Sequence, residues 1–332
     1  MAIEQLKAIA LLSGGLDSAL AIKAVQIQGV DVLAVHYVIP FLRYEHETVC
    51  ESSAYSICAQ LDCRLRIVDI SEEFLEVLKN PPHGYGRNLN PCIDCKILML
   101  KKAKEIMHQE RAQFVITGEV LNQRPMSQHF RSLQEIEKKS GLGGALVRPL
   151  SALLLSVTIP QEKGWLDQKH LFDISGRGRT RQISLAKEWG LIEYPWPGGG
   201  CRLTDASFSQ RVADLLTHDA LSVANVKLSK RGRFFRMTPE LFFVVGRNEK
   251  ENGMLGEQIH PDDTVFYPYI LPGPTAIARG KMNDEDIISC ARIVARYTQP
   301  QGAVEIKITK NGTEQVMSVS QLPQDELKSF LR

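Results

Sequence analysis

The stretch Ser13-Gly14-Gly15-Leu16-Asp17-Ser18 decides the fold, because it follows an apolar run at residues 8–12 and opens a helical pattern at residues 18–28. Gly14 and Gly15 let backbone N–H groups approach an anion, and the start of the helix directs its positive end to the same place. Ser13 and Ser18 offer hydroxyl donors, and Asp17 is suited to holding Mg²⁺ beside a polyphosphate. The stretch therefore predicts a phosphate-binding loop after a buried strand.

Two other phosphate-binding motifs do not match this loop. A Walker loop would require Gly-x-x-x-x-Gly-Lys-Ser/Thr, and the stretch has no such lysine. The dinucleotide fingerprint Gly-x-Gly-x-x-Gly is absent as well. The structural alternative is a Ser-Gly-Gly turn that leads into a helix capped by Asp17. The position directly after an apolar strand favours a ligand site, because ligands of parallel sheets bind at the carboxyl ends of strands.

The first part of the chain alternates strand patterns with helical patterns. After the loop, apolar or β-branched runs are expected to form strands at residues 32–38, 65–70 and 113–117. Helical patterns are expected at residues 45–60, 72–79, 93–110 and 127–139. Such alternation predicts an α/β domain in which a parallel sheet carries helices on both faces.

A boundary is expected at Tyr194-Pro195-Trp196-Pro197-Gly198-Gly199-Gly200, because prolines stop a helix and glycines permit unusual backbone conformations. Beyond it the pattern is that of a smaller α+β domain, with helices expected at residues 208–216 and 287–297 and strands at 241–245, 264–267 and 304–309. We expect a catalytic domain over residues 1–195, a linker over 196–224 and an RNA-binding α+β domain over 225–332.

The hexapeptide Ser13–Ser18 resembles the PP-loop of the ATP-pyrophosphatases, which share an adenine nucleotide hydrolase-like α/β fold. Members of that family cleave ATP between the α- and β-phosphates and adenylate a carbonyl oxygen. The resemblance implies that Ser13, Gly14, Gly15, Asp17 and Ser18 bind ATP with Mg²⁺. It also implies a nucleotide contact near the end of the next strand, around His36.

A second segment, Thr117-Gly118-Glu119 with Gln123, Ser127 and Gln128, is similar to one in tRNA thiouridine synthetases. The resemblance implies that Thr117 and Gly118 also bind ATP, and that the chain is a tRNA sulfurtransferase. The segments 148–150 and 175–182 resemble the same group more loosely. The latter holds three arginines beside glycines, which suits phosphate contact or, alternatively, a solvated helix start.

Cysteines narrow the chemistry further. Among the seven cysteines, Cys92 and Cys95 have metal-ligand spacing in Asn90-Pro91-Cys92-Ile93-Asp94-Cys95-Lys96, and Cys201 follows three glycines. A helix N-terminus there would lower the pKa of the second thiol. Three thiolates suit a [4Fe-4S] cluster with one open iron. The trio resembles the iron–sulfur class of tRNA thiolation enzymes, so the resemblance implies that Cys92, Cys95 and Cys201 are catalytic metal ligands, with Asp17 as the catalytic acidic residue of the loop.

Two alternatives stay open for these cysteines. Cys92 and Cys95 could form a redox pair in which one carries a persulfide, or a zinc site could be completed by His83. The remaining cysteines, Cys50, Cys58, Cys63 and Cys290, are expected to be small buried hydrophobic residues.

Lys227-Leu228-Ser229-Lys230-Arg231-Gly232-Arg233-Phe234-Phe235-Arg236 contains five basic residues and no acid. We expect Lys227, Lys230, Arg231, Arg233 and Arg236 to bind RNA phosphates while the aromatic rings stack on bases. The alternative is that Phe234 and Phe235 are core residues on a solvated edge. Further segments, 245–252 and 271–275, resemble an RNA-binding domain known from ribosome quality-control factors, over about residues 225–298.

Composition limits the remaining classes. The 332 residues carry a net charge of +2, too little to indicate nucleic-acid binding without local patches. No apolar run approaches the roughly 20 residues that span a bilayer, and no secretory signal is present, so a cytoplasmic location without membrane association is expected. The first strand begins close to Met1, so we expect no RNA-capturing domain before the catalytic one.

The expected partners are tRNA and a sulfur donor, either sulfide or sulfur from a cysteine desulfurase. Which uridine is modified, at C2 or at C4, and whether the chain forms a homodimer stay open. So do two rival functions: a PP-loop ligase or sulfur transferase for a small molecule, and a non-catalytic RNA-binding protein that senses nucleotide.

Overall fold

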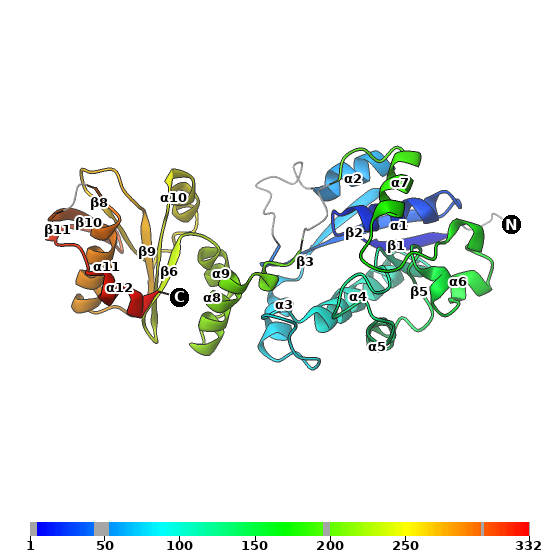
Figure 1. The fold of residues 1–332 in the computed structure, drawn as a ribbon, viewed down its shortest axis with the longest axis horizontal. Helices are drawn as coiled ribbons and strands as arrows, with labels where there is room; N and C mark the ends of the chain where they lie inside the picture. The colour runs from blue at the N-terminus through cyan, green and yellow to red at the C-terminus, as the bar shows by residue number, and fades with distance from the viewer. Residues whose placement is uncertain (1–4, 43–52, 195–199, 300–301, 332) are drawn as a thin grey trace. The chain divides into compact units, whose positions relative to one another are not determined.

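The computed structural model describes residues 5–42, 53–194, 200–299 and 302–331. The chain forms two compact units, Met1–Thr204 and Asp205–Arg332, each with its own sheet (Figure 1). Within the described residues, no helix has the length and apolar character needed to cross a membrane.

The first unit is built on a parallel sheet of five strands in the order β3-β2-β1-β4-β5. Its strands are β1 (Lys7–Leu11), β2 (Asp31–Val38), β3 (Arg64–Asp69), β4 (Phe114–Thr117) and β5 (Leu146–Val147). Its α-helices are α1 (Leu16–Gln26), α2 (Ser53–Leu61), α3 (Ser71–Lys79), α4 (Cys92–Gln109), α5 (Phe130–Ser140), α6 (Ile159–Glu162) and α7 (Thr180–Glu188). This confirms the expected α/β class.

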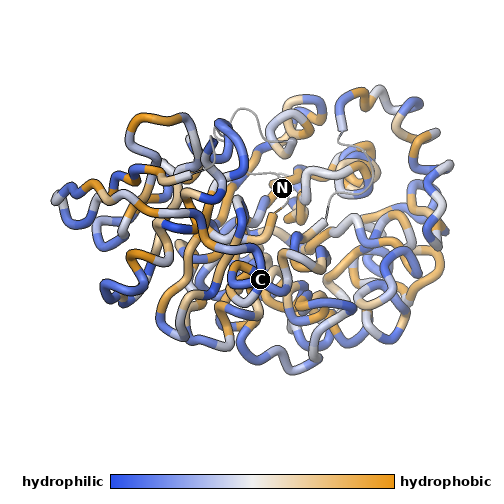
Figure 2. The backbone as a smooth tube through the Cα atoms, turned by 60° about the vertical axis from the view of Figure 1, so that its left-hand side comes forward, coloured by the Kyte–Doolittle hydropathy of each residue, from blue (hydrophilic) through white to orange (hydrophobic). Residues whose placement is uncertain are grey.

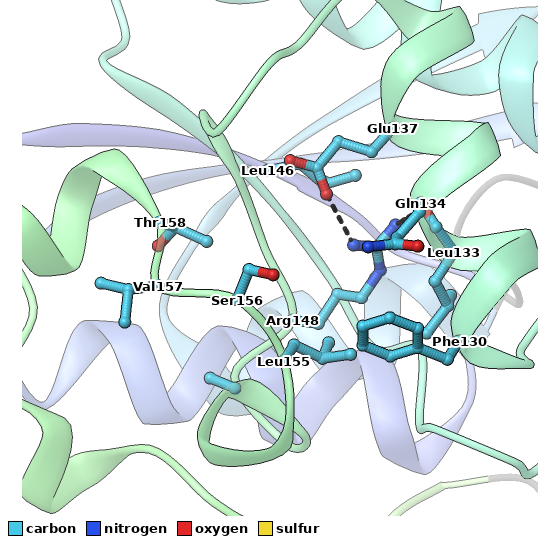
Figure 3. Close-up of a pocket in the computed structure, with 11 residues that line it drawn as sticks. Phe130, Leu133, Gln134, Glu137, Leu146, Arg148, Leu155, Ser156, Val157 and Thr158 are labelled. Atoms are coloured by element: carbon cyan, nitrogen blue, oxygen red, sulfur yellow. Dashed lines mark hydrogen bonds and ion pairs between the residues drawn. The ribbon is translucent and has the colours of Figure 1, made fainter.

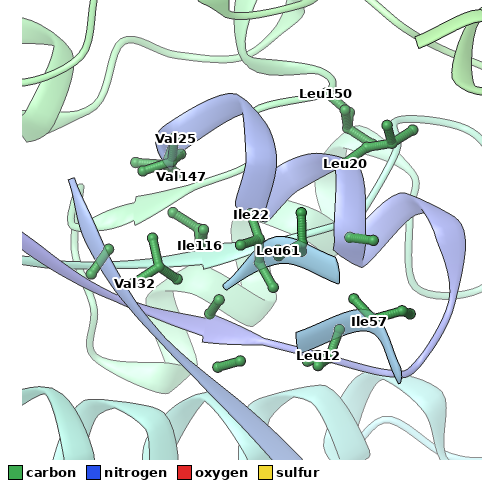
Figure 4. Close-up of a cluster of buried hydrophobic side chains, with 14 of the residues drawn as sticks. Leu12, Leu20, Ile22, Val25, Val32, Ile57, Leu61, Ile116, Val147 and Leu150 are labelled. Carbon is green, nitrogen blue, oxygen red and sulfur yellow. The ribbon is translucent and has the colours of Figure 1, made fainter. Parts of the chain in front are cut away.

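Helices cover both faces of this sheet. Alternate residues of a strand point to opposite faces, and in β1 both sets are buried, which is typical of a parallel sheet between two helix layers. One face packs against α1 and α2, as Leu20, Ile22 and Ile57 show in Figure 4. On the other face α4 packs against β1, α3 and α5. Burying each such aliphatic side chain contributes about 1.5–3 kcal/mol.

The second unit is built on an antiparallel sheet of six strands in the order β11-β10-β8-β9-β7-β6. The strands are β6 (Arg233–Thr238), β7 (Leu241–Val245), β8 (Thr264–Pro268), β9 (Ala276–Gly280), β10 (Val304–Lys310) and β11 (Thr313–Val319). The helices are α8 (Ala206–Thr217), α9 (Val223–Ser229), α10 (Glu249–Gly256), α11 (Asp284–Arg296) and α12 (Gln324–Phe330).

Helix α11 supplies Cys290, Ile293 and Val294 to the core of this unit. The path of hydrophobic and hydrophilic segments along both units can be followed in Figure 2. The expected smaller α+β domain is confirmed in class.

The boundary between the units differs from the expected linker over residues 196–224. The two units divide between Thr204 and Asp205, and α8 begins immediately afterwards. Asp214 of α8 pairs with Arg236 of β6, so this helix belongs to the second unit rather than to a connecting segment. Residues 195–199, where the sequence suggested the break, lie outside the described residues.

Candidate functional site

The phosphate loop has the backbone that its glycines predicted. Gly14 has a φ of +77°, in the left-handed region that favours glycine, and Gly15 is the N-cap of α1. The hydroxyl of Ser18 donates to the carbonyl of Gly15 at 2.7 Å, and the amide of Ser13 donates to the Ser18 oxygen at 3.3 Å. Ser18 therefore shapes the loop from within, while Ser13 is exposed at its surface.

Asp17 lies in the first turn of α1 with two partners from distant segments. Its Oδ2 accepts a hydrogen bond from Gln123 at 3.1 Å and pairs with the guanidinium of Arg179 at 3.4 Å. Its Oδ1 is buried and has no partner among the described residues. A buried oxygen of this kind fits a hard cation such as Mg²⁺, which carboxylates bind together with phosphate oxygens.

Gly118 brings the end of β4 against the phosphate loop. A Cβ atom at this position would lie 2.4 Å from the Ser18 nitrogen and 2.5 Å from the Asp17 carbonyl carbon, so only glycine fits. The next residue, Glu119, is 2% exposed; its Oε2 accepts from Thr117 at 3.2 Å and from Arg148 at 3.1 Å. The end of β4 and the phosphate loop that follows β1 thus meet at one edge of the sheet.

Glu119 is held as a carboxylate by cations that the sequence analysis did not single out for this role. Burial alone would raise its pKa, but Lys96 and Arg148 outweigh burial and lower the pKa below the ordinary value. Its Oε1, like Asp17 Oδ1, is buried without a partner in the described part of the chain. A sequence signal existed only for Arg148, which lies in one of the segments similar to thiouridine synthetases.

His36 lies in β2, beside the strand that leads into the loop. Its Nδ1 lies 2.9 Å from the carbonyl oxygen of Leu12, the residue that precedes Ser13. The ring is therefore fixed at the base of the phosphate loop, in the region where the PP-loop resemblance expects a nucleotide contact.

Cys92 and Cys95 occupy the first turn of α4, as the spacing suggested. The side-chain amide of Asn90 donates to the Cys92 sulfur at 3.1 Å, a contact that the sequence analysis missed. The backbone of Cys201 forms an isolated antiparallel β-bridge with Leu42, and the amide of Arg202 donates to the carbonyl of Phe41 at 2.9 Å. The segment with Cys201 is thus tied to the chain just beyond β2.

The expected low pKa of the second thiol is wrong. Burial raises the pKa of Cys95 well above its ordinary value; Lys96 lowers it in part, while Cys201, Cys92 and Asp94 add to the rise. Desolvation of the thiolate therefore outweighs the helix N-terminus. The same contributions indicate that the thiols of Cys92 and Cys201 each lie within electrostatic reach of Cys95.

No group of three or more His, Cys, Asp or Glu side chains in the described residues is close enough to hold a metal ion as it stands. His83, the residue considered for a zinc site, has other partners: Nδ1 lies 2.6 Å from Asp94 Oδ1 and Nε2 lies 3.6 Å from Glu135 Oε1. The ring is therefore engaged by carboxylates, and the zinc alternative has no support. Of the other cysteines, Cys58 and Cys290 are buried as expected, Cys63 is half-buried, and Cys50 lies outside the described residues.

A small pocket shares Arg148 with this site. It has a volume of about 60 Å³ and is lined by Phe130, Leu133 and Ser156 together with the Arg148–Glu137 ion pair (Figure 3). Ligand pockets for molecules of nucleotide size have roughly 300–1,000 Å³, so this one cannot hold the nucleotide. The loop edge remains the candidate site.

In the second unit, part of the predicted RNA strip is wrong. Phe234 and Phe235 are fully buried, so they cannot stack on bases, and the core alternative is the correct one. Arg236 is buried and its Nε donates to Asp214 at 2.8 Å, while Lys230 is buried as well. The alternation of basic and apolar residues marks strand β6 and not a surface. Of the five cations, Lys227 is exposed and Arg231 and Arg233 are half-buried.

The parallel sheet with a glycine loop at its carboxyl edge defines a PP-loop α/β domain. Residues 4–154 match the family described as thiamine biosynthesis protein (ThiI), and residues 232–331 match the NFACT protein RNA binding domain. Residues 4–154 are thus similar to a ThiI-type PP-loop domain, and residues 232–331 are similar to an NFACT-type RNA-binding domain. The resemblances to PP-loop thiouridine synthetases and to the RNA-binding domain of ribosome quality-control factors are confirmed, and the match to the latter extends to residue 331.

Similar proteins cover parts of this architecture. The tRNA-specific 2-thiouridylase MnmA of Petrotoga mobilis is 32% identical over 130 residues, which are 35% of this chain and 35% of that protein. A probable tRNA sulfurtransferase of Thermococcus kodakarensis is 26% identical over 184 residues, covering 55% of this chain and 43% of that protein. A solved 4-thiouridine synthetase–RNA complex with bound ATP shares 27% identity at a TM-score of 0.40, covering 55% and 40% of the two chains. The chain thus spans less than half the length of these three proteins.

Proposed function

We propose that this protein is an ATP-dependent tRNA thiouridine synthetase. A carbonyl oxygen of a uridine attacks the α-phosphorus of ATP, the bond to the β-phosphate breaks, and pyrophosphate leaves. A sulfur nucleophile then attacks the activated carbon and AMP leaves with the former carbonyl oxygen. Activation is needed because an unactivated carbonyl oxygen is a poor leaving group.

The observation that carries the proposal is a row of residues, joined by close packing or by electrostatic interaction, that runs from the phosphate loop to the thiols. Gly118 touches Asp17 and Ser18, and Glu119 follows it in the chain. Lys96 acts on both Glu119 and Cys95, and Cys95 is influenced by Cys201. ATP activation and sulfur transfer must occur at the same uridine, so their groups have to lie at one edge of the sheet.

The residues of the row divide the work in this proposal. Amides of Gly14 and Gly15 hold pyrophosphate, with Ser13 and Ser18 as hydroxyl contacts, and Asp17 holds Mg²⁺. His36, Thr117 and Gly118 surround the nucleotide. A [4Fe-4S] cluster bound by Cys92, Cys95 and Cys201 would supply an open iron for sulfide. The hydrogen bond that the Asn90 side-chain amide donates to the Cys92 sulfur is of the kind that cluster-binding thiolates accept. The tRNA is held by the second unit.

Anaerobic purification followed by iron counting and absorbance tests the sulfur chemistry, and nucleoside mass spectrometry of tRNA from a deletion strain tests the product. We expect thiouridine to be lost in that strain, and Cys201→Ala to remove both iron and activity. Cys63→Ala is the matched control, because this half-buried cysteine lies outside the trio. Unchanged thiouridine in the deletion strain would reject the proposal.

If iron-free protein stays active and carries a persulfide on Cys92 or Cys95, the thiolation proposal stands, and the persulfide takes the place of the cluster as the carrier of sulfur. Pyrophosphate release that depends on a small molecule and never on tRNA would favour a small-molecule ligase instead. tRNA binding without any pyrophosphate release would favour a nucleotide sensor.

A further inference from the structure

The two ends of the sheet in the second unit differ in charge. Because the strands are antiparallel, one end collects the starts of β6, β9 and β10 with the ends of β7, β8 and β11. Beside β6 and β7, this end holds the accessible cations Arg231, Arg233, Arg247 and Lys250 with the acids Glu249 and Glu251, and we call it the basic end after this cluster. Beside β10 and β11 it holds Arg296 with the exposed acids Glu305, Asp325 and Glu326.

The opposite end is acidic. Its loops and adjoining helix turns carry Glu240, Glu257, Asp262, Asp263, Asp284, Glu285, Asp286 and Glu314, against the cations Arg279, Lys281 and Lys310. A polyanion is therefore attracted to the cations beside β6 and β7 at the basic end and repelled from the opposite end. The net charge of the whole chain, +2, hides this separation.

The loops of the basic end are held in place by one side chain. Asn252 donates from Nδ2 to the carbonyl of Gly273 at 3.2 Å, and its Oδ1 accepts from the amide of Thr275 at 3.0 Å. The amide of Gly246 donates to the carbonyl of Thr275 at 3.0 Å. The loop that presents Arg247 and the loop that follows β8 are thus joined into one fixed surface.

Aromatic and apolar side chains lie in the loops at the same end of the sheet. The guanidinium of Arg233 stacks 4.1 Å from the ring centre of Tyr297 and donates to the carbonyl of Gly246 at 3.2 Å. Tyr269 is 53% exposed and Ile270 is 77% exposed, both in the loop after β8. Exposed rings next to cations are the combination that binds unpaired RNA, because phosphates are neutralised and bases stack.

We propose that the basic end is the surface by which the second unit binds RNA, with Arg247 and Lys250 contacting phosphates and Tyr269 stacking on an unpaired base. The inference rests on the proposed function for the identity of the RNA as tRNA. It retains Arg231 and Arg233 of the strip at residues 227–236 but not Lys230 and Arg236, which are buried.

The test compares two double variants of the full chain. Arg247→Gln with Lys250→Gln removes two exposed cations of the basic end, and Lys281→Gln with Lys310→Gln removes two exposed cations of the acidic end as a matched control. Binding of unmodified tRNA is measured by fluorescence anisotropy over a series of KCl concentrations. We expect the first variant to bind roughly tenfold more weakly, with a salt slope smaller by about 2, and the control to stay within about twofold.

Tyr269→Ala adds an independent readout, since loss of stacking weakens binding without changing the salt slope. Equal weakening in both double variants, or in neither, would overturn the basic end while leaving tRNA binding itself intact. A wild-type chain that binds no tRNA would reject the proposed function together with this surface. Release of pyrophosphate from ATP, measured on the same preparations, shows whether the first unit remains folded and active.

Discussion

At the scale of single residues, Arg179 is distinguished from its neighbours by one contact. Arg177 and Arg181 are exposed, and Arg181 pairs with Asp173 at 2.6 Å, whereas Arg179 is half-buried and reaches Asp17. The phosphate loop has no lysine of its own, and the contact with Asp17 places Arg179 beside the loop, so in the proposed function Arg179 contacts the polyphosphate.

Arg179→Gln should therefore weaken pyrophosphate binding roughly 10- to 100-fold, the range expected when a charge-assisted hydrogen bond of about 1.5–3 kcal/mol is lost. AMP binding should change much less, and Arg179→Lys should restore part of the lost affinity for pyrophosphate. Isothermal titration calorimetry with pyrophosphate and with AMP measures the two affinities. Arg177→Gln and Arg181→Gln are the controls; a comparable loss in either would mean that general charge, and not this position, matters.

Lys230 gives a prediction about pH. Burial lowers the pKa of Lys230 to about 8, with a smaller contribution from Arg231. An unfolded lysine has a pKa of about 10.4, so between about pH 8 and 10.4 the unfolded chain binds more protons and stability rises with pH. Below about pH 8 the cost of the buried charge is fully present.

Lys230→Met should raise the free energy of unfolding at pH 7 by an amount on the order of 3 kcal/mol. The advantage of the variant should shrink as the pH rises from 8 to 10. Urea denaturation of both proteins across this range measures the difference. An advantage that stays constant with pH would show that packing, and not the charge, is responsible.

At the scale of helices and strands, the approach of β4 to α1 is what aligns the loop with the segment 117–119. Gly118→Ala would force the Asp17–Ser18 backbone away, since its Cβ has no room. Overpacking of this kind costs typically about 1–3 kcal/mol, and it should also lower ATP affinity because the loop amides move. Gly178→Ala is a matched control nearby, because its Cβ would meet nothing within 4 Å. Differential scanning fluorimetry with and without ATP gives both quantities.

The elements that could be predicted from the sequence are those with strong apolar patterns. β1, β2, α4 and β7 lie within a residue or two of their expected bounds. β11 was missed because it pairs with β10 alone at the edge of the sheet and is largely exposed, so it lacks apolar alternation. β6 was interpreted as an RNA strip because the partner that buries Arg236, Asp214, lies 22 positions earlier in the chain.

Some residues of the candidate site could likewise be predicted from the sequence, and others could not. The phosphate loop, Thr117 and Gly118 could be predicted because they belong to two short motifs, at residues 13–18 and 117–119, each of which is recognisable by itself. The cations acting on Asp17 and Glu119, namely Arg179, Arg148 and Lys96, come from three separate segments. Local sequence patterns do not show which of many basic residues the fold brings to a given carboxylate.

At the scale of the whole molecule, the proposed function assigns ATP chemistry and RNA binding to two units with separate cores. Perturbations in units without a shared core are expected to be additive. Asp17→Asn should therefore abolish pyrophosphate release while tRNA affinity stays within about twofold of wild type, because the substitution removes a cation ligand and changes nothing in the second sheet. Arg247→Gln with Lys250→Gln should weaken tRNA binding but leave pyrophosphate release unchanged when tRNA is saturating, since ATP cleavage then no longer depends on the affinity for tRNA. Pyrophosphate release at saturating tRNA and fluorescence anisotropy at equilibrium, measured on both variants, test both expectations.

If Asp17→Asn also lost tRNA affinity in the absence of ATP, the first unit would have to contribute directly to RNA binding, and the assignment of RNA binding to the second unit alone would be wrong.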